Sequence, residues 1–133
     1  MKKKIKILLI DNDPFIRMLV KDIFWVYGRD RYQILAAESL EKGEEILKKE
    51  KPDLIFLDLV FPKDGLETRS SLNFLQEVKS NPKTEDIKVI VFSGYLDLKE
   101  ICLNLGAEKF LTKGEYLPKE LFELTEKMLR ERK

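Results

Sequence analysis

The chain has 133 residues, 44% of them hydrophobic, which suits one folded domain with its own core and excludes a disordered chain. Its 25 basic and 24 acidic residues leave a net charge of +1, which provides no general attraction to nucleic acid or membrane surfaces. Histidine is absent and Cys102 is the one cysteine, which excludes histidine catalysis, internal disulfides and cysteine-based metal clusters. No segment reads as a membrane span or secretory signal, so we expect a cytoplasmic protein.

Strand and helix patterns alternate from the start of the chain. The apolar run at 5–10 predicts a buried strand, and Pro14 begins a helix that Gly28 can close. Residues 32–37 predict a second strand, and residues 39–50 predict a second helix that begins at Ser39. Such alternation is typical of a parallel sheet with helices on both faces.

The same alternation continues to the end of the chain. A third strand is predicted at 53–58, a loop at 59–70, and a helix at 71–80. A fourth strand and helix follow at 87–93 and 95–106. The last strand and helix are expected at 108–112 and 117–132. We therefore predict one α/β domain of five strands and five helices.

Polar residues follow four of these strands, where the carboxyl ends of parallel strands share one edge. They are Asp11, Asn12, Asp13, Asp58, Ser93 and Lys113. Asp58 lies between apolar residues, so solvation does not explain it. Carboxylates that lie close together repel unless a cation joins them, and oxygen ligands favour Mg²⁺. A metal, an ammonium group and a hydroxyl around one carboxylate would suit a phosphoryl group.

Four motifs, "LLIDNDPFIR", "PDLIFLDLVFP", "VIVFSG" and "GAEKFLTKG", give the sequence a strong resemblance to the receiver domain of two-component response regulators. The resemblance covers nearly the whole chain. It implies a CheY-like, flavodoxin-like (βα)5 fold with strand order 2-1-3-4-5. It also implies a phospho-acceptor rather than an enzyme, one that takes a phosphoryl group from a partner histidine kinase or phosphotransfer protein with the help of Mg²⁺.

The resemblance also implies roles for single residues. Asp58 would be the phospho-acceptor, while Asp11, Asn12, Asp58 and the backbone carbonyl of Val60 would hold Mg²⁺. Ser93 and Lys113 would bind phosphoryl oxygens, and Ser93 with Phe110 would form the switch. Asp13 fits a helix cap better than a metal ligand. Val60 and Tyr95 lie where side chains influence hydrolysis of the aspartyl phosphate; neither can orient water, so slow self-dephosphorylation is expected.

Three departures from the family pattern stand out. Asn12 replaces a carboxylate, so Mg²⁺ affinity should fall. Gly114 replaces the usual proline after Lys113; the Lys113–Gly114 bond should be trans, which would hold Lys113 less firmly. The loop 59–70 is longer than usual, and it would shield the site or contact a partner.

Two alternatives remain open from the sequence. Asn12 and Gly114 motivate a degenerate receiver that binds partners without phosphorylation. The "IDND" motif also resembles haloacid-dehalogenase-type phosphatases, with Asp11 as nucleophile and Asp13 as acid/base. That reading leaves Asp58 unexplained and lacks a later acidic motif.

We expect residues 1–133 to form a single receiver domain without an output domain, as a monomer or weak dimer. A downstream target would bind the face formed by the fourth helix, fifth strand and fifth helix, approximately at 96–105, 109–112 and 117–129.

Overall fold

The five strands of the protein form one parallel sheet. The computed structural model describes residues 3–59, 66–94 and 96–131. The strands are β1 (Ile5–Ile10), β2 (Tyr32–Ala37), β3 (Leu54–Leu57), β4 (Lys88–Ser93) and β5 (Lys109–Thr112). Their order is β2-β1-β3-β4-β5, and every neighbouring pair is parallel. The predicted α/β class and strand order are confirmed, with strand ends within one residue of those predicted.

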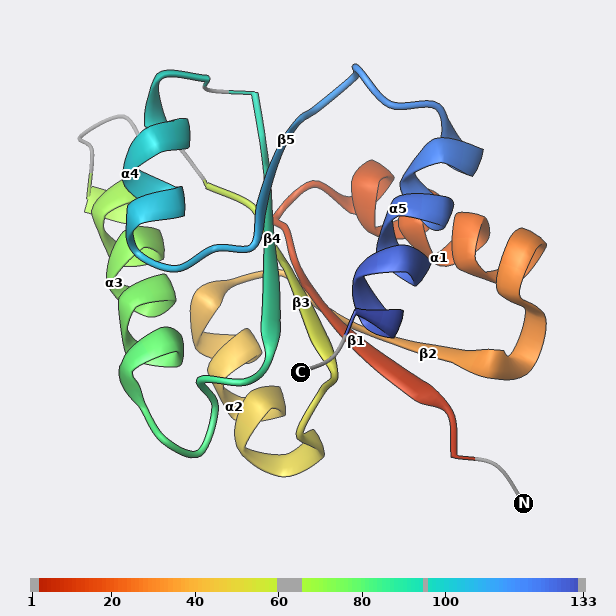
Figure 1. The fold of residues 1–133 in the computed structure, drawn as a ribbon, viewed down its shortest axis with the longest axis horizontal. Helices are drawn as coiled ribbons and strands as arrows, with labels where there is room; N and C mark the ends of the chain where they lie inside the picture. Colours follow the sequence, from red (N-terminus) through yellow and green to blue (C-terminus); the bar gives the residue numbers. More distant parts are fainter. Residues whose placement is uncertain (1–2, 60–65, 95, 132–133) are drawn as a thin grey trace.

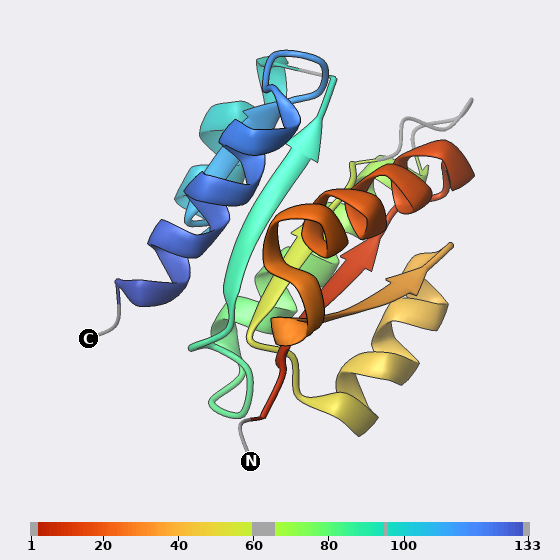
Figure 2. The same ribbon diagram turned by 90° about the vertical axis from the view of Figure 1, so that its right-hand side faces the viewer.

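Helices cover both faces of this sheet (Figure 1). They are α1 (Pro14–Gly28), α2 (Leu40–Glu50), α3 (Leu66–Ser80), α4 (Lys99–Asn104) and α5 (Pro118–Arg130). Helices α1 and α5 lie on one face, and α2, α3 and α4 lie on the other (Figures 1 and 2). Two short 3-10 turns, η1 (Arg29–Arg31) and η2 (Leu96–Leu98), complete the described elements.

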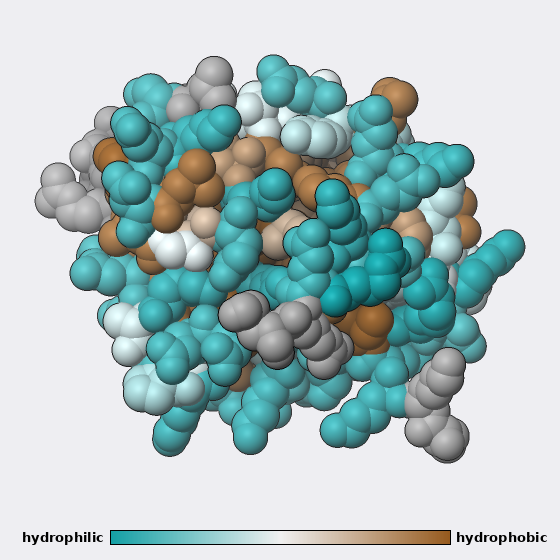
Figure 3. Space-filling view, viewed as in Figure 1, coloured by the Kyte–Doolittle hydropathy of each residue, from teal (hydrophilic) through white to brown (hydrophobic). Residues whose placement is uncertain are grey.

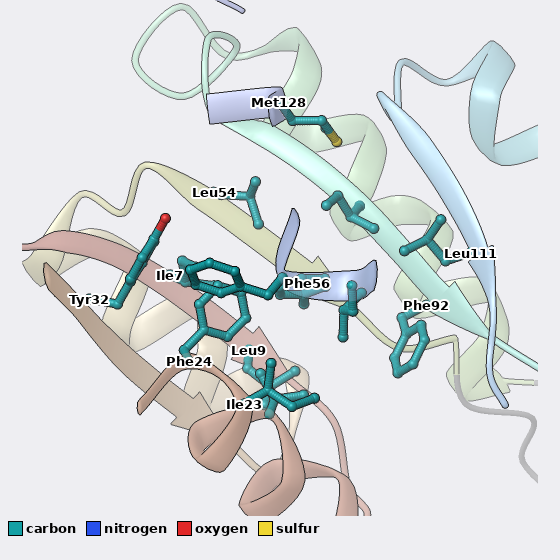
Figure 4. Close-up of a cluster of buried hydrophobic side chains, with 14 residues drawn as sticks. Ile7, Leu9, Ile23, Phe24, Tyr32, Leu54, Phe56, Phe92, Leu111 and Met128 are labelled. Carbon is teal, nitrogen blue, oxygen red and sulfur yellow. The ribbon is translucent and has the colours of Figure 1, made fainter. Parts of the chain in front are cut away.

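The core has two layers because successive strand residues point to opposite faces. Ile7 and Leu9 of β1 pack toward α1 and α5, whereas Leu8 and Ile10 pack toward α2 and α3. The first layer is rich in aromatic rings, which Figure 4 shows close together. The Phe24 ring lies 5.0 Å from that of Tyr32, centroid to centroid. Such contacts fix α1 and α5 firmly against the sheet.

The predicted starts of the first two helices agree with the structure. Asp13 is the N-cap of α1, where its carboxylate accepts a hydrogen bond from the Phe15 N–H, and Pro14 lies in the first turn. Ser39 caps α2 by accepting from the Lys42 N–H at 3.1 Å. Helix α1 ends at Gly28 as predicted, although the residue with a positive φ is the next one, Arg29, at 55°. A Cβ on Gly28 would lie 2.5 Å from the Tyr32 ring, so this glycine allows close packing instead.

Two helices also differ from the prediction. Helix α3 begins at Leu66 rather than at 71, so it includes part of the predicted loop. The predicted helix 95–106 is shorter, with the η2 turn preceding α4, and α4 has no side-chain cap. Cys102 is buried in α4 as predicted, and burial raises the pKa of its thiol to about 11, which keeps it protonated.

The surface is mostly hydrophilic in the view of Figure 3, but hydrophobic side chains gather between α4 and α5, where β5 runs. Ile101 and Leu103 of α4 are exposed, as is Leu117 just before α5. None of the helices among the described residues has the length and apolar character needed to cross a membrane.

Candidate functional site

The site lies at the carboxyl edge of the sheet, where backbone hydrogen bonds hold the residues after the strands side by side. The Asp11 N–H donates to the Ala37 carbonyl, and the Asp58 N–H donates to the Ile10 carbonyl, both at 3.0 Å. The Lys113 N–H donates to the Ser93 carbonyl at 2.9 Å. The pairing of strands therefore continues one residue past its regular end and places these functional groups at one edge.

One ammonium group joins two buried carboxylates at this edge. Nζ of Lys113 lies 3.0 Å from Oδ2 of Asp11 and 2.9 Å from Oδ1 of Asp58. The Asp11 side chain is fully buried, and that of Asp58 is 8% exposed. The described cluster of Asp11, Asp58 and Lys113, hereafter the acidic site, has two negative charges and one positive charge. It therefore has one formal negative charge in excess when both carboxyl groups are ionised.

The excess charge affects the pKa values of the acidic site. Burial raises the pKa of Asp58, the charge of Asp11 raises it further, and Lys113 offsets only part of this, leaving it at about 6. Burial by itself would lower the pKa of Lys113, but its interactions with the carboxylates of Asp58 and Asp11 reverse the direction and raise it. Lys113 is therefore charged at neutral pH, and Asp58 is mostly a carboxylate with an unusually high affinity for a proton.

Asp11 has an oxygen that its surroundings do not satisfy. Its Oδ1 accepts a hydrogen bond from the Asp13 N–H at 2.9 Å. Its Oδ2 is close enough to Lys113 for an ion pair, but the angles are not those of a hydrogen bond. Among the described residues it is the one buried side-chain polar atom without a hydrogen-bond partner. A buried oxygen of this kind, beside a second carboxylate, fits a hard cation such as Mg²⁺.

The other residues predicted near the site are Asn12 and Val60, as Mg²⁺ ligands, and Tyr95, which was expected to influence hydrolysis. Asn12 is exposed, next to Asp11 in the chain, and Val60 and Tyr95 lie outside the described residues. In the described part of the chain, no group of three or more histidine, cysteine or acidic residues could hold a metal. The two carboxylates at the edge would therefore need neutral oxygen ligands to complete a site, as the predicted amide and backbone carbonyl would supply.

The two predicted switch residues lie on neighbouring strands. Ser93 is fully buried at the end of β4, where it pairs with Thr112 of β5. Phe110 is also buried, and it packs in the core layer beneath α3 and α4. The aromatic side chain thus points inward in this structure, and its role as a switch stays a prediction.

Two further residues at this site were not predicted from the sequence. The guanidinium of Arg17 donates a hydrogen bond to the Asp11 backbone carbonyl at 2.8 Å, which ties α1 to the end of β1. Nζ of Lys113 lies 5.7 Å from the centroid of the Phe92 ring, within the range of a cation–π contact. Both lie within the quoted motifs, Arg17 at the end of "LLIDNDPFIR" and Phe92 in "VIVFSG", but the sequence assigned neither of them a role.

The peptide bond after Lys113 agrees with the prediction, because the described residues contain no cis bond. Gly114 has a φ of 87°, a conformation that glycine adopts without strain and that proline excludes. Lys113 nevertheless reaches both carboxylates.

Comparison with known proteins gives the family. The sequence model described as "Response regulator receiver domain" matches residues 7–126. The probable C4-dicarboxylate response regulator DctR of Bacillus subtilis is 34% identical over 84% of this chain and 47% of its own length. The chain thus spans about half of that relative. The probable chemotaxis protein CheY of Rhizobium etli is 32% identical over 84% of this chain and 82% of its own length.

Solved structures agree with the sequence comparison. The signal receiver domain of a DNA-binding response regulator (merR) from Colwellia psychrerythraea has 27% identity and a TM-score of 0.79, covering 97% of this chain and 100% of that one. A CheY-like receiver domain protein from Methanospirillum hungatei has 24% identity and a TM-score of 0.80, covering 97% and 96%, which shows the shared fold. The chain belongs to the response regulator receiver domain family.

Proposed function

We propose that the chain accepts a phosphoryl group on Asp58 from a phosphohistidine of a partner kinase or phosphotransfer protein. A carboxylate oxygen of Asp58 would attack the phosphorus, while the bond between phosphorus and the imidazole nitrogen breaks and the imidazole leaves with the electron pair. Receiver domains are signalling phospho-acceptors, so the product is a modified protein and not a released metabolite.

The shared contact of Lys113 with Asp11 and Asp58 carries this proposal. Once Asp58 is phosphorylated, it no longer has a free carboxylate for Lys113, and the ammonium group can pair with a phosphoryl oxygen instead. Ser93, buried at the next strand end, would donate its hydroxyl to another oxygen. These groups would stabilise negative charge that spreads over the phosphoryl group during transfer.

Mg²⁺ fits the same site. Asp11, Asp58, Asn12 and the carbonyl of Val60 would hold it, and the unsatisfied Oδ2 of Asp11 supports this choice. When bound, the ion would neutralise charge on the phosphoryl oxygens. Asn12 would contribute an amide oxygen without a charge, so we expect weaker binding than with a second acidic residue at that position.

The signal of phosphorylation would reach a target protein through the surface formed by α4, β5 and α5. Ile101, Leu103 and Leu117 give the face of α4, β5 and α5 exposed apolar groups that a target protein could cover. Ser93 lies at the end of β4, and Phe110 of the neighbouring β5 packs in the core layer with residues of α3 and α4. A movement of Ser93 toward a phosphoryl group would change the space available to Phe110 and so alter this face.

Incubation with acetyl phosphate and Mg²⁺, followed by mass spectrometry of the intact protein, tests the proposal. We expect the mass to rise by one phosphoryl group, and the gain to disappear in Asp58→Asn. Asp86→Asn, which removes an exposed carboxylate elsewhere, is the matched control and should be phosphorylated normally. Absence of any gain would support the degenerate receiver. Donor turnover that depends on Asp11 and not on Asp58 would support the phosphatase.

A further inference from the structure

The side chain of Arg17 holds the backbone next to the acidic site. Its Nη1 donates to the carbonyl of Asp11, six residues earlier in the chain, at 2.8 Å. The Arg17 N–H donates to the Asp13 carbonyl at 3.1 Å, which closes the first turn of α1. Arg17 is partly buried, and α1 is packed on the sheet through Val20 and Phe24. The guanidinium therefore reaches from a fixed helix to the end of β1.

The charge of Arg17 is not explained by an ion pair. Within the described part of the chain its guanidinium pairs with no carboxylate, and the first turn of α1 contains no acidic residue. The amino end of a helix has a partial positive charge, which disfavours a cation there. Partial burial of an unpaired cation adds a further cost. The acidic site offsets these costs, because it has one negative charge in excess and includes Asp11, the residue that Arg17 contacts.

Two hydrogen bonds fix the conformation of the chain from Asp11 to Asp13. The carbonyl that Arg17 holds belongs to the peptide unit between Asp11 and Asn12, so the contact limits the rotation of this planar unit. The next N–H, that of Asp13, donates to Oδ1 of Asp11 at 2.9 Å. A rotation of the first unit would move the Asp13 N–H away from Oδ1. The carboxylate, with its unsatisfied Oδ2, would then lose its present direction.

We propose that Arg17 is a positioning residue for the Mg²⁺ site, and that it acts through the peptide unit between Asp11 and Asn12. This inference rests on the proposed function, since it concerns ligands of the same metal. Arg17 keeps Oδ2 of Asp11 directed at the acidic site and limits the positions open to the Asn12 amide. Groups that orient metal ligands in this way typically change metal affinity by about ten- to a hundredfold.

The charge of Arg17 and its hydrogen bond have opposite effects on Mg²⁺. A cation near the site repels the ion, so loss of the charge alone would strengthen binding. Loss of the hydrogen bond would weaken binding, because the Asp11 carboxylate would no longer be held. We expect the second effect to dominate: the guanidinium is partly exposed, where water and salt screen its charge, whereas the Asp11 side chain is fully buried. The sign of the change in Mg²⁺ affinity therefore distinguishes the two.

Two substitutions of Arg17 separate its charge from its hydrogen bond. Arg17→Met removes both, and Arg17→Lys keeps the charge on a shorter side chain without the planar fork. Both should raise the dissociation constant for Mg²⁺ about tenfold, measured from the shift of the melting temperature with Mg²⁺ concentration. Lys21→Met removes an exposed cation from the same helix and is the matched control, with unchanged affinity.

Two outcomes of this experiment would contradict the proposal. Tighter binding in Arg17→Met, with unchanged binding in Arg17→Lys, would mean that only the charge of Arg17 acts on the metal. A melting temperature that falls by the same amount at every Mg²⁺ concentration would mean that Arg17 only stabilises α1.

A measurement without metal tests the positioning step itself. The amide nitrogen of Asn12 belongs to the peptide unit whose carbonyl accepts from Arg17, so its nuclear magnetic resonance reports this hydrogen bond. In Arg17→Met without Mg²⁺, we expect the amide resonances of Asn12 and Asp13 to move. The Glu108 amide, which donates to the Val89 carbonyl at 2.9 Å away from the site, is the control and should stay in place. Unmoved resonances of Asn12 and Asp13 would overturn the proposal.

Phosphorylation by acetyl phosphate distinguishes a failure of this inference from a failure of the proposed function. At limiting Mg²⁺ the rate on Asp58 should fall about tenfold in Arg17→Met, and excess Mg²⁺ should restore most of it. If the unaltered chain gains no phosphoryl group while Arg17→Met still weakens Mg²⁺ binding, the proposed function fails and the role of Arg17 stands. If the unaltered chain is phosphorylated and Arg17→Met shows the same dependence on Mg²⁺, only the role of Arg17 fails.

Discussion

Two partly buried ion clusters lie at opposite ends of the sheet, and they differ in how completely their polar groups are satisfied. At the amino end, Nζ of Lys79 donates to the carbonyls of Glu85 and Ile87 and to the Glu108 carboxylate, at 2.8–3.0 Å. The second oxygen of Glu108 accepts from the Val89 N–H at 2.7 Å. All three donors of the ammonium group and both carboxylate oxygens have partners.

At the carboxyl end, the acidic site is incomplete. Two carboxylates share the single ammonium of Lys113, one oxygen of Asp11 has no hydrogen bond, and the pKa of Asp58 is raised to about 6. Both clusters are partly buried and contain ion pairs, so neither property distinguishes a functional site from an ion pair that only stabilises the fold. The difference lies in the unmatched charge, which leaves room for a cation or a proton. Four changes test this comparison.

Lys79→Met should have the largest effect on stability. It leaves two carbonyls and a carboxylate without their donor, and because the Glu108 side chain is 34% exposed, the loss should be about 2 to 3 kcal/mol of unfolding free energy. Urea denaturation measures the loss, with the exposed Lys119→Met as control. Folded Lys79→Met should still be phosphorylated on Asp58. A loss of phosphorylation in a folded variant would mean that the amino-end cluster is functional after all.

Asp58→Asn should raise the unfolding free energy, whereas Lys79→Met should lower it. The pKa of Asp58 is about 6 in the folded state against 3.8 normally, so the folded state binds more protons than the unfolded state between these values. Stability conferred through Asp58 therefore falls as pH rises from about 4 to 6, by about 2 to 3 kcal/mol. The advantage of Asp58→Asn should be near zero at pH 4 and complete at pH 7. Denaturation curves at both pH values check this, and equal stability at pH 7 would contradict it.

The fold was largely predictable because strands and helices depend on patterns within single segments. Apolar runs placed all five strands, and Asp13 and Ser39 marked two helix starts. The missed start of α3 lies in a polar segment, Glu67 to Ser70, that has no hydrophobic period, so the helix extends there by its own hydrogen bonds. The short α4 was missed because apolar spacing does not reveal a missing cap.

The sequence predicted where the site lies, but not how many carboxylates share its one ammonium group. Topology brings the carboxyl ends of parallel strands together, which was enough to group Asp11, Asp58, Ser93 and Lys113. Whether a lysine serves one carboxylate or two depends on side-chain geometry across three strands, and no local pattern encodes it. The Lys79–Glu108 link was missed for the same reason, since both residues are ordinary surface residues by sequence.

Asn12→Asp should add a second unpaired negative charge to the acidic site, which makes its charge differ more from that of the Lys79–Glu108 cluster. A carboxylate in place of the amide adds a ligand charge, so Mg²⁺ affinity should rise about tenfold, equivalent to about 1.4 kcal/mol. The shift of the melting temperature with Mg²⁺ concentration reports the affinity. The isosteric exposed change Asn104→Asp controls for net charge and should leave the affinity unchanged. If both variants respond alike, Asn12 lies outside the metal site.

Phe92→Leu should have the smallest effect on phosphorylation, because it removes the ring beneath Lys113 but none of the charged groups; the same ring also packs against Phe56 in the core, so some stability is lost as well. A partly exposed cation–π contact contributes about 0.5–1 kcal/mol, so the rate of phosphorylation by acetyl phosphate should fall about two- to fivefold. Phe92→Tyr keeps the ring and should restore the rate, whereas a purely structural role would make both variants lose stability without this split in rate. Urea denaturation of both variants, beside the kinetics, separates the two roles. An unchanged rate in Phe92→Leu would mean that the two carboxylates alone position Lys113, despite the flexible Gly114 that follows it.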